Sequence, residues 1–156
     1  MSQVEVRLKE LGIEIPDVVT PAGAYVPAVR HGRLVFTAGQ LPMTGGALPQ
    51  TGKVGEGDGL VSPADARVYA RTCALNALAA ARSVLGSLDE VERIVKVTGF
   101  VASDPSFTGQ PGVVNGASDV LGEIFGDDGR HARSAVGVAV LPLDSPVEVE
   151  LILAVK

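Results

Sequence analysis

The chain has 156 residues, and its 13 Lys and Arg against 18 Asp and Glu give a net charge of −5. A chain of this length forms one domain with a sizeable core, and its single Cys excludes an internal disulfide and favours a reducing compartment. The acidic balance and the few aromatic residues argue against nucleic-acid binding, and no apolar run approaches the roughly 20 residues of a membrane span. We therefore expect one cytoplasmic domain over residues 1–156 that binds neither nucleic acid nor membranes.

The N-terminal segment predicts a short helix followed by an extended connector. Ser2 and Glu5 fit a capping box, and apolar residues recur at helical spacing up to Gly12. We expect the helix over residues 3–11. Two prolines make residues 13–23 an extended connector.

Two β-rich runs over residues 25–30 and 33–38 predict a hairpin. Between them lies His31-Gly32, a two-residue connection in which Gly supplies a positive φ and His tolerates one. Residues 39–59 are rich in Gly, Pro and Thr and lack periodicity, which predicts a long surface loop. Long loops in compact domains are often functional.

A long helix is expected after this loop. Ser62 is a good N-cap, Pro63 suits the first helical position, and Gly86 ends the pattern. A stripe of mainly small residues lets the helix lie close to a sheet, and it consists of Ala66, Ala70, Cys73, Ala77, Ala81 and Val84. The stripe makes Cys73 an inert buried residue rather than a nucleophile.

The C-terminal half predicts three strands and a second, weaker helix. The strands are expected over residues 93–103, 133–140 and 147–155, and the helix over 112–125. We interpret the last two strands as a hairpin. The order of elements favours an α+β fold in which two helices pack on one face of a mainly antiparallel sheet.

The last two strands indicate that the other face of the sheet is also covered. Val and Leu occupy one face of the strand over residues 147–155, and Glu148 and Glu150 lie on the other face with Ile and Ala. The strand over residues 133–140 is apolar on both faces. A neighbouring subunit is the simplest cover.

Common catalytic signatures are missing from the sequence. It has no HExxH, CxxC, P-loop, GxSxG or GxGxxG motif, and no set of residues has the spacing of metal ligands. His31 and His131 both adjoin turns, so we expect both to be solvated.

Arg133 and Glu148 are the candidate functional residues. Arg133 opens an apolar strand, and Glu148 lies near the start of its expected partner strand. A guanidinium beside an apolar surface is suited to bidentate binding of a carboxylate. The alternative is an ion pair between the two strand ends, which would contribute little.

Three stretches of sequence carry a family resemblance. They are Thr37-Ala38-Gly39-Gln40-Leu41-Pro42, then Arg133-Ser134-Ala135-Val136 with Val138 and Leu141-Pro142, and finally Val147-Glu148-Val149-Glu150. In this order they resemble the RidA family, also called YjgF or L-PSP, of reactive-intermediate deaminases, over about residues 25–156. The resemblance implies a chorismate-mutase-like fold and a homotrimer with clefts between its subunits.

The resemblance also implies an activity, the hydrolysis of enamines and imines such as 2-aminoacrylate and 2-iminopropionate to a 2-oxo acid and ammonia. A protonated imine is already electrophilic, so orientation of substrate and water suffices without metal or cofactor. By resemblance, Arg133 binds the substrate carboxylate and Glu148 helps to place the attacking water. The further residues that the resemblance places at the substrate are Tyr25, Gly39, Asn115 and Ala135.

The chain departs from the family pattern at two positions. Ala38 stands where many members have a Ser that can hydrogen-bond the ligand, and Ala135 stands where many have Cys and would contribute its backbone carbonyl. The chain is also longer than compact members, through the N-terminal helix and the Gly-rich segment 43–59, and resembles a longer branch. The missing hydroxyl at Ala38 leaves a non-catalytic small-carboxylate-binding trimer as the alternative function. Ribonuclease activity, a label that the family also carries, is a third, and the charge weighs against it.

Overall fold

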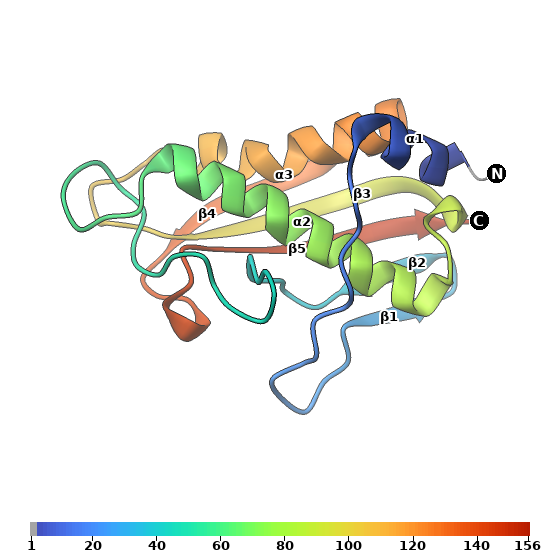
Figure 1. Ribbon diagram of the computed structural model, residues 1–156, viewed down its shortest axis with the longest axis horizontal. Helices are drawn as coiled ribbons and strands as arrows, with labels where there is room; N and C mark the ends of the chain where they lie inside the picture. The colour runs from blue at the N-terminus through green and yellow to red at the C-terminus, as the bar shows by residue number, and fades with distance from the viewer. Residues whose placement is uncertain (1–2) are drawn as a thin grey trace.

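Five strands form one sheet in the order β1-β2-β5-β3-β4 in the computed structural model, which describes residues 3–156 (Figure 1). Their bounds are Ala28–His31 (β1), Leu34–Thr37 (β2), Val91–Ala102 (β3), Ala132–Val138 (β4) and Val147–Val155 (β5). Neighbouring strands are antiparallel except β3 and β4, which run parallel. The predicted α+β class with a mainly antiparallel sheet is confirmed.

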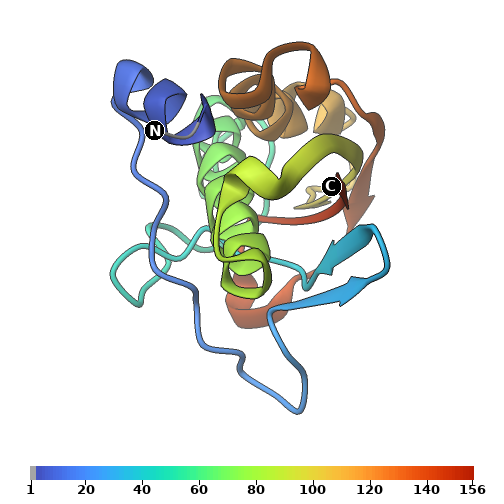
Figure 2. The same cartoon turned by 90° about the vertical axis from the view of Figure 1, so that its right-hand side faces the viewer.

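Two helices cover one face of the sheet, and a third lies near the N-terminus (Figures 1 and 2). Their bounds are Gln3–Leu11 (α1), Pro63–Leu85 (α2) and Gln110–Phe125 (α3), and short 3₁₀ turns span Leu88–Glu90 (η1), Gly126–Gly129 (η2) and Pro142–Asp144 (η3). In the part of the chain that is described, no helix has the length and apolar character needed to cross a membrane.

The caps of α2 are those that the sequence predicts. The Ser62 hydroxyl accepts a hydrogen bond from the backbone N–H of Asp65 at 3.1 Å, and Gly86 ends the helix with a φ of 80°. Most of the predicted small-residue stripe is buried, but Val84 is 39% exposed. Leu85, four residues after Ala81, packs against the core in its place.

Cys73 lies fully buried on this stripe, as predicted. Burial, with a smaller contribution from the charge of Glu148, raises the pKa of the Cys73 thiol well above its ordinary value. The thiol therefore stays protonated and unreactive at neutral pH.

α1 has the predicted bounds and buries Leu8. The N–H of Val4 donates to Oδ1 of Asp89 at 2.9 Å, so a carboxylate from η1 lies at the positive end of the α1 dipole. The capping box predicted at Ser2 and Glu5 depends on a residue outside the described range.

The β1–β2 hairpin differs from the prediction by one residue in its turn. His31 pairs with Leu34, so the two turn residues are Gly32 and Arg33, and Gly32 takes the positive φ of 59°. The first strand begins at Ala28 rather than at residue 25. Pro27 has no backbone N–H to donate to a neighbouring strand, which agrees with a strand that begins after it.

The expected hairpin of the last two strands is wrong, because β3 lies between them. β4 pairs with β3, and β5 pairs with β2 and β3. α3 connects β3 to β4 as a crossover, and a helical crossover joins parallel neighbours. The chain then crosses to the centre of the sheet through η3, where Leu143 and Asp144 have positive φ values of 57° and 56°.

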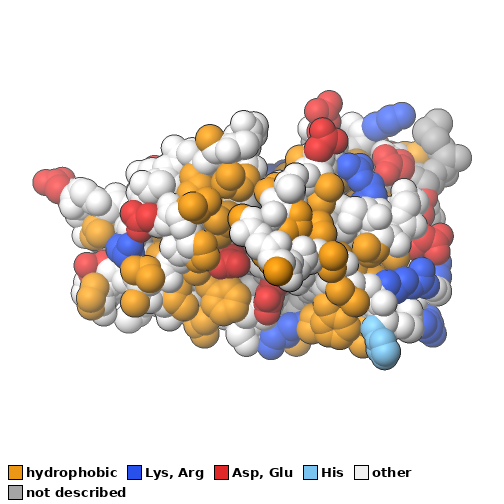
Figure 3. Space-filling model, turned by 90° about the horizontal axis from the view of Figure 1, so that it is seen from below, with side chains coloured by type: hydrophobic (Ala, Val, Ile, Leu, Met, Phe, Trp, Pro, Cys, Tyr) orange, Lys and Arg blue, Asp and Glu red, His pale blue; other side chains and the backbone are white. Residues whose placement is uncertain are grey.

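Alternation along β5 divides the two faces of the sheet as predicted. The odd-numbered residues from Val147 to Val155 are all buried toward the helices, whereas Glu148 and Glu150 lie on the opposite face. We call this second face the open face. Figure 3 views the molecule from that side and shows apolar side chains across it. The open face includes Phe36 and Val136, which are 41% and 43% exposed.

Candidate functional site

Arg133 on β4 is directed toward α3. Residues directly opposite each other on neighbouring strands share a face, and Arg133 lies opposite Val97, which is fully buried under the helices. The Arg133 Nη1 donates to Oδ1 of Asn115 at 2.7 Å and to Oγ of Ser118 at 3.1 Å. The predicted positions 115 and 133 are therefore brought together.

Ala135 lies two residues further along β4, on the same face. It is opposite Gly99 of β3. A side-chain carbon on Gly99 would lie 2.5 Å from the side chain of Val114 on α3. Ala135 is half-buried and packs against the core. Together with Arg133 and Asn115, it forms what we call the β4–α3 edge group.

Ser118 and His131 belong to the same cluster and were missed by the sequence analysis. Oγ of Ser118 lies 2.9 Å from Nε2 of His131, and Nδ1 of His131 lies 2.6 Å from the carbonyl oxygen of Gly129. His131 is half-buried, so the expectation of a solvated turn residue is wrong. A signal was present: Ser118 follows Asn115 by three residues on a helix, and His131 precedes Arg133 by two.

Glu148 lies on the open face and is half-buried. Within residues 3–156 its carboxylate has neither a hydrogen-bond nor an ion-pair partner. Burial raises the pKa of Glu148, and the negative charge of Glu150 raises it further. An unneutralised carboxylate of this kind is a better proton acceptor than an exposed one.

Gly39 holds the backbone directly against this carboxylate. The next residue, Gln40, exchanges two backbone hydrogen bonds with Val149, at 2.8 and 3.0 Å, which fixes the segment beside β5. A side-chain carbon on Gly39 would lie 2.0 Å from Oε1 of Glu148. Only a residue without a side chain leaves room for the observed position of the carboxylate.

Tyr25 is 53% exposed and lines the same small cavity as Gly39. The cavity has a volume of about 120 Å³, and its other lining residues are mainly apolar and include Met43 and Leu143. Tyr25, Gly39 and Glu148 together form what we call the β5 group.

The two predicted catalytic residues are separated within one chain. Glu148 lies opposite Phe100 of β3 and Arg133 lies opposite Val97, so strand spacing places their Cα atoms roughly 14 Å apart. Their side chains also point to opposite faces of the sheet. The alternative interpretation, an ion pair between the two strand ends, is therefore excluded within one chain, and one small substrate cannot contact both residues of the same chain.

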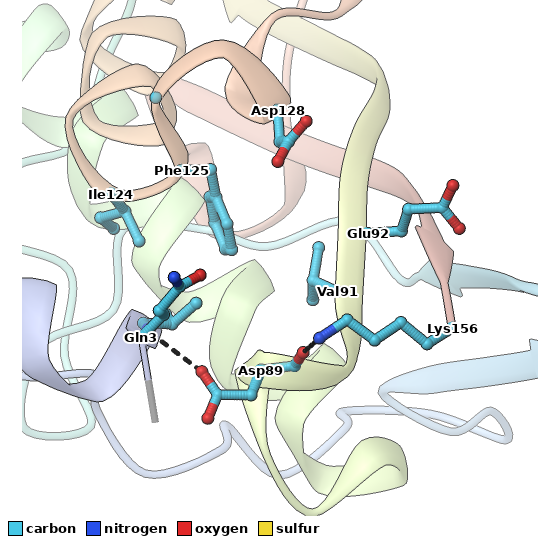
Figure 4. A pocket seen from close by; sticks show the side chains of 10 residues that line it. Gln3, Asp89, Val91, Glu92, Ile124, Phe125, Asp128 and Lys156 are labelled. Carbon is cyan, nitrogen blue, oxygen red and sulfur yellow. Dashed lines mark hydrogen bonds between the residues drawn. The ribbon is translucent and has the colours of Figure 1, made fainter. Parts of the chain in front are cut away.

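A larger cavity of about 720 Å³ is lined by residues of α1, η1 and η2 and by Lys156 (Figure 4). It contains none of the predicted site residues. Its side chains hold the fold together: Asp89 caps α1, and Nζ of Lys156 donates to the Asp89 carbonyl at 2.6 Å. Among the residues described, no three His, Cys, Asp or Glu side chains are grouped so that they could hold a metal ion.

Comparisons with known proteins agree on one family. The family model described as "YjgF/chorismate_mutase-like, putative endoribonuclease" matches residues 5–155. Protein TCP17 of Trypanosoma cruzi is 41% identical over 152 residues, which cover 97% of this chain and 93% of that protein.

Comparison with solved structures agrees with this family. A Shewanella oneidensis protein with the same endoribonuclease description is 33% identical, with a TM-score of 0.91 and coverage of 97% of this chain and 99% of that one. E. coli TdcF with bound serine is 26% identical, with a TM-score of 0.63 and coverage of 90% and 98%. Since the family model spans nearly the whole chain and the fold agrees, this chain belongs to the YjgF/Rid family with its chorismate-mutase-like fold.

Proposed function

We propose that this protein hydrolyses 2-imino acids and their enamine tautomers, of the 2-iminopropionate type, to 2-oxo acids and ammonia. The reaction takes place in clefts between the subunits of a homotrimer. The observation that carries the proposal is the pair of unneutralised charges on each chain, the Arg133 guanidinium on one face of the sheet and the Glu148 carboxylate on the other. Two copies of the chain can bring these charges to one ligand, which one copy cannot.

The open face supports assembly. It exposes large apolar side chains over several strands, including Val29 at 51%, Phe36 at 41% and Val136 at 43%. A contiguous apolar surface of this kind is typical of a subunit interface. A second copy that covers it would place its own β4–α3 edge group near the β5 group of the first.

The β4–α3 edge group supplies the binding of a carboxylate. Among the described residues, the hydrogen-bond acceptors of Arg133 are uncharged, so its positive charge is available to a ligand. A guanidinium binds a carboxylate through two parallel N–H donors. TdcF, a relative of the same fold, binds serine, a small molecule with a carboxylate beside its amino group.

The β5 group supplies the base. As a water oxygen bonds to the imine carbon, Glu148 accepts a proton from that water, and a carbinolamine forms. Glu148 returns this proton to nitrogen, the carbon–nitrogen bond breaks with its electron pair leaving on ammonia, and the hydroxyl group gives its proton back to Glu148 as the carbonyl of the 2-oxo acid forms. The raised pKa of Glu148 strengthens it as a base at neutral pH.

Ammonia release from freshly generated 2-iminopropionate tests the proposal. We expect release above the buffer rate, and a fall in kcat/KM of about tenfold to a hundredfold for Arg133→Lys, which keeps the charge but loses one donor of the fork. Arg133→Ala should lose more. Release at the buffer rate by the wild-type protein would contradict the proposal.

A second candidate function is supported by Ala38, which lacks a hydroxyl group for the ligand. In that case the trimer binds small carboxylates without turning them over. Calorimetric titration with pyruvate separates the two functions: binding without ammonia release identifies the carboxylate-binding protein. The ribonuclease function predicts RNA cleavage instead, which an acidic chain with few aromatic residues does not favour.

A further inference from the structure

We propose that Ser118 and His131 are positioning residues that hold one edge of the Arg133 guanidinium, so that only the edge formed by Nε and Nη2 receives the substrate carboxylate. This inference rests on the proposed function, because it concerns the same site. It adds two residues to the site and specifies which two N–H groups form the fork.

The contacts of Arg133 with α3 leave some of its N–H donors free. Arginine has five N–H groups, one on Nε and two on each terminal nitrogen. Nη1 donates to Asn115 Oδ1 at 2.7 Å and to Ser118 Oγ at 3.1 Å, so both of its donors are engaged. Nη2 makes only a long contact of 3.4 Å with the Pro111 carbonyl.

The position of these acceptors determines the free edge. All three lie on α3, so the outer edge of the guanidinium, between Nη1 and Nη2, faces the helix. No described residue accepts a hydrogen bond from Nε of Arg133. A carboxylate can therefore bind side-on, with one oxygen on Nε and the other on Nη2.

His131 fixes the orientation of the Ser118 hydroxyl. The Gly129 carbonyl can only accept, so Nδ1 of His131, 2.6 Å away, carries its proton. In the neutral ring Nε2 is then an acceptor, and the Ser118 hydroxyl, 2.9 Å away, donates to it. This leaves the oxygen lone pairs of Ser118 directed toward Nη1 of Arg133.

The three residues thus form a directed chain of hydrogen bonds, from the guanidinium through the hydroxyl to the imidazole. Loss of the imidazole acceptor frees the Ser118 hydroxyl to rotate and weakens its hold on Nη1. Loss of the hydroxyl leaves one Nη1 donor unengaged. Either change lets the guanidinium turn, so the fork toward the substrate is no longer preorganised.

Matched substitutions test this role. We expect Ser118→Ala and His131→Phe each to weaken pyruvate binding and raise KM by about threefold to tenfold, the effect of one hydrogen bond, with a smaller change in kcat. Ser118→Thr keeps the hydroxyl and His131→Gln keeps an acceptor near the position of Nε2, so both should restore most of the affinity. Ser83→Ala, which removes a hydroxyl bonded within α2, is the control.

A double-mutant cycle separates positioning from a general effect on the fold. In an Arg133→Lys background, which keeps the charge and measurable binding but lacks the fork, Ser118→Ala and His131→Phe should cause no further loss of binding. Single variants that bind pyruvate as tightly as wild type, while Arg133→Ala alone abolishes binding, would overturn this inference and leave the proposed function intact. Full binding and turnover by Arg133→Ala would instead overturn the proposed function.

A measurement on the wild-type protein does not depend on the folding of any variant. In protein labelled with ¹⁵N-arginine, the Nε–H signal of Arg133 is assigned by its absence in Arg133→Lys. Pyruvate should shift this signal and slow its exchange with water. Saturation with pyruvate that leaves the Nε–H signal unmoved would mean that the carboxylate does not bind this edge.

Discussion

Gly39 and Glu148 are in contact so close that a side-chain carbon on Gly39 would lie 2.0 Å from Oε1 and 2.9 Å from Cδ of Glu148. Gly39→Ala should therefore turn the carboxylate out of its observed position while the backbone keeps its hydrogen bonds to β5. A displaced catalytic group can cost up to about a hundredfold in rate, so we expect kcat to fall by roughly tenfold to a hundredfold. Gly112→Ala, whose new carbon meets nothing within 4 Å, is the control. An unchanged kcat in Gly39→Ala would mean that the position of Glu148 is irrelevant to turnover.

Glu148→Gln should lower turnover and leave pyruvate binding largely intact, because an amide cannot accept the proton that a carboxylate accepts. In the wild-type protein the rate should rise with pH on the acidic side, with a midpoint above the ordinary pKa of a glutamate, since the pKa of Glu148 is raised. Initial rates from pH 4 to 8 on the two proteins measure this. Equal loss of binding and turnover would assign Glu148 a structural role.

The same substitution should raise thermal stability at neutral pH. Because the pKa of Glu148 is raised in the folded state, the folded protein binds more protons than the unfolded chain between the ordinary and the raised pKa. The free energy of unfolding of the wild-type protein therefore falls as pH rises through that window. Glu148→Gln has no titrating group at this position, so its free energy of unfolding does not fall for this reason. We expect the Tm of Glu148→Gln to exceed that of wild type by a margin that grows from acidic to neutral pH. A constant difference across this range would contradict the cause assigned to the shift.

The open face should determine the oligomeric state. Val136→Asp places a charge on this face, and Val68→Asp places the same charge on α2, where Val68 is 60% exposed. We expect light scattering to give three times the 16.0 kDa chain mass for wild type and for Val68→Asp, and a lower mass with loss of turnover for Val136→Asp. If wild-type protein is monomeric at micromolar concentration, the proposed site between subunits cannot form.

Gly116 allows the close approach of α2 and α3. A side-chain carbon there would lie 1.9 Å from the backbone oxygen of Arg67, and backbone cannot move aside as a flexible side chain can. We expect Gly116→Ala to reduce the free energy of unfolding by about 1 to 3 kcal/mol, the usual cost of overpacking. Gly122→Ala, on the same helix but with open space around it, should instead be neutral or stabilising by up to about 1 kcal/mol. Urea denaturation of both variants makes the comparison.

Local signals in the sequence predicted the local structure well. The caps at Ser62 and Gly86 bound α2 correctly, and the alternation in β5 gave the correct division between its buried and open faces. These features depend on residues a few positions apart. The sequence does not predict the pairing of β4 with β3. This pairing depends on how the chain crosses the sheet, and the residues near either strand carry no information about that path.

The same limit applies to the candidate site. The sequence identifies Arg133 and Glu148 as candidate site residues. Their side chains point to opposite faces of the sheet because of the register of β5, β3 and β4, and neither motif contains that information. The turn beside His131 predicts a solvated side chain, but its contact with Ser118 arises only when α3 packs beside β4.

The strand at the centre of the sheet follows the other four strands in the chain. β5 ends at Val155 and joins β2 on one side to β3 on the other, so before it emerges from the ribosome the sheet exists only as two separate pieces. The nascent chain must therefore keep two unpaired strand edges from aggregating until β5 pairs with both of them. Removal of residues 147–155 would therefore not trim an edge of the sheet but would divide its core into two pieces, β1-β2 and β3-β4.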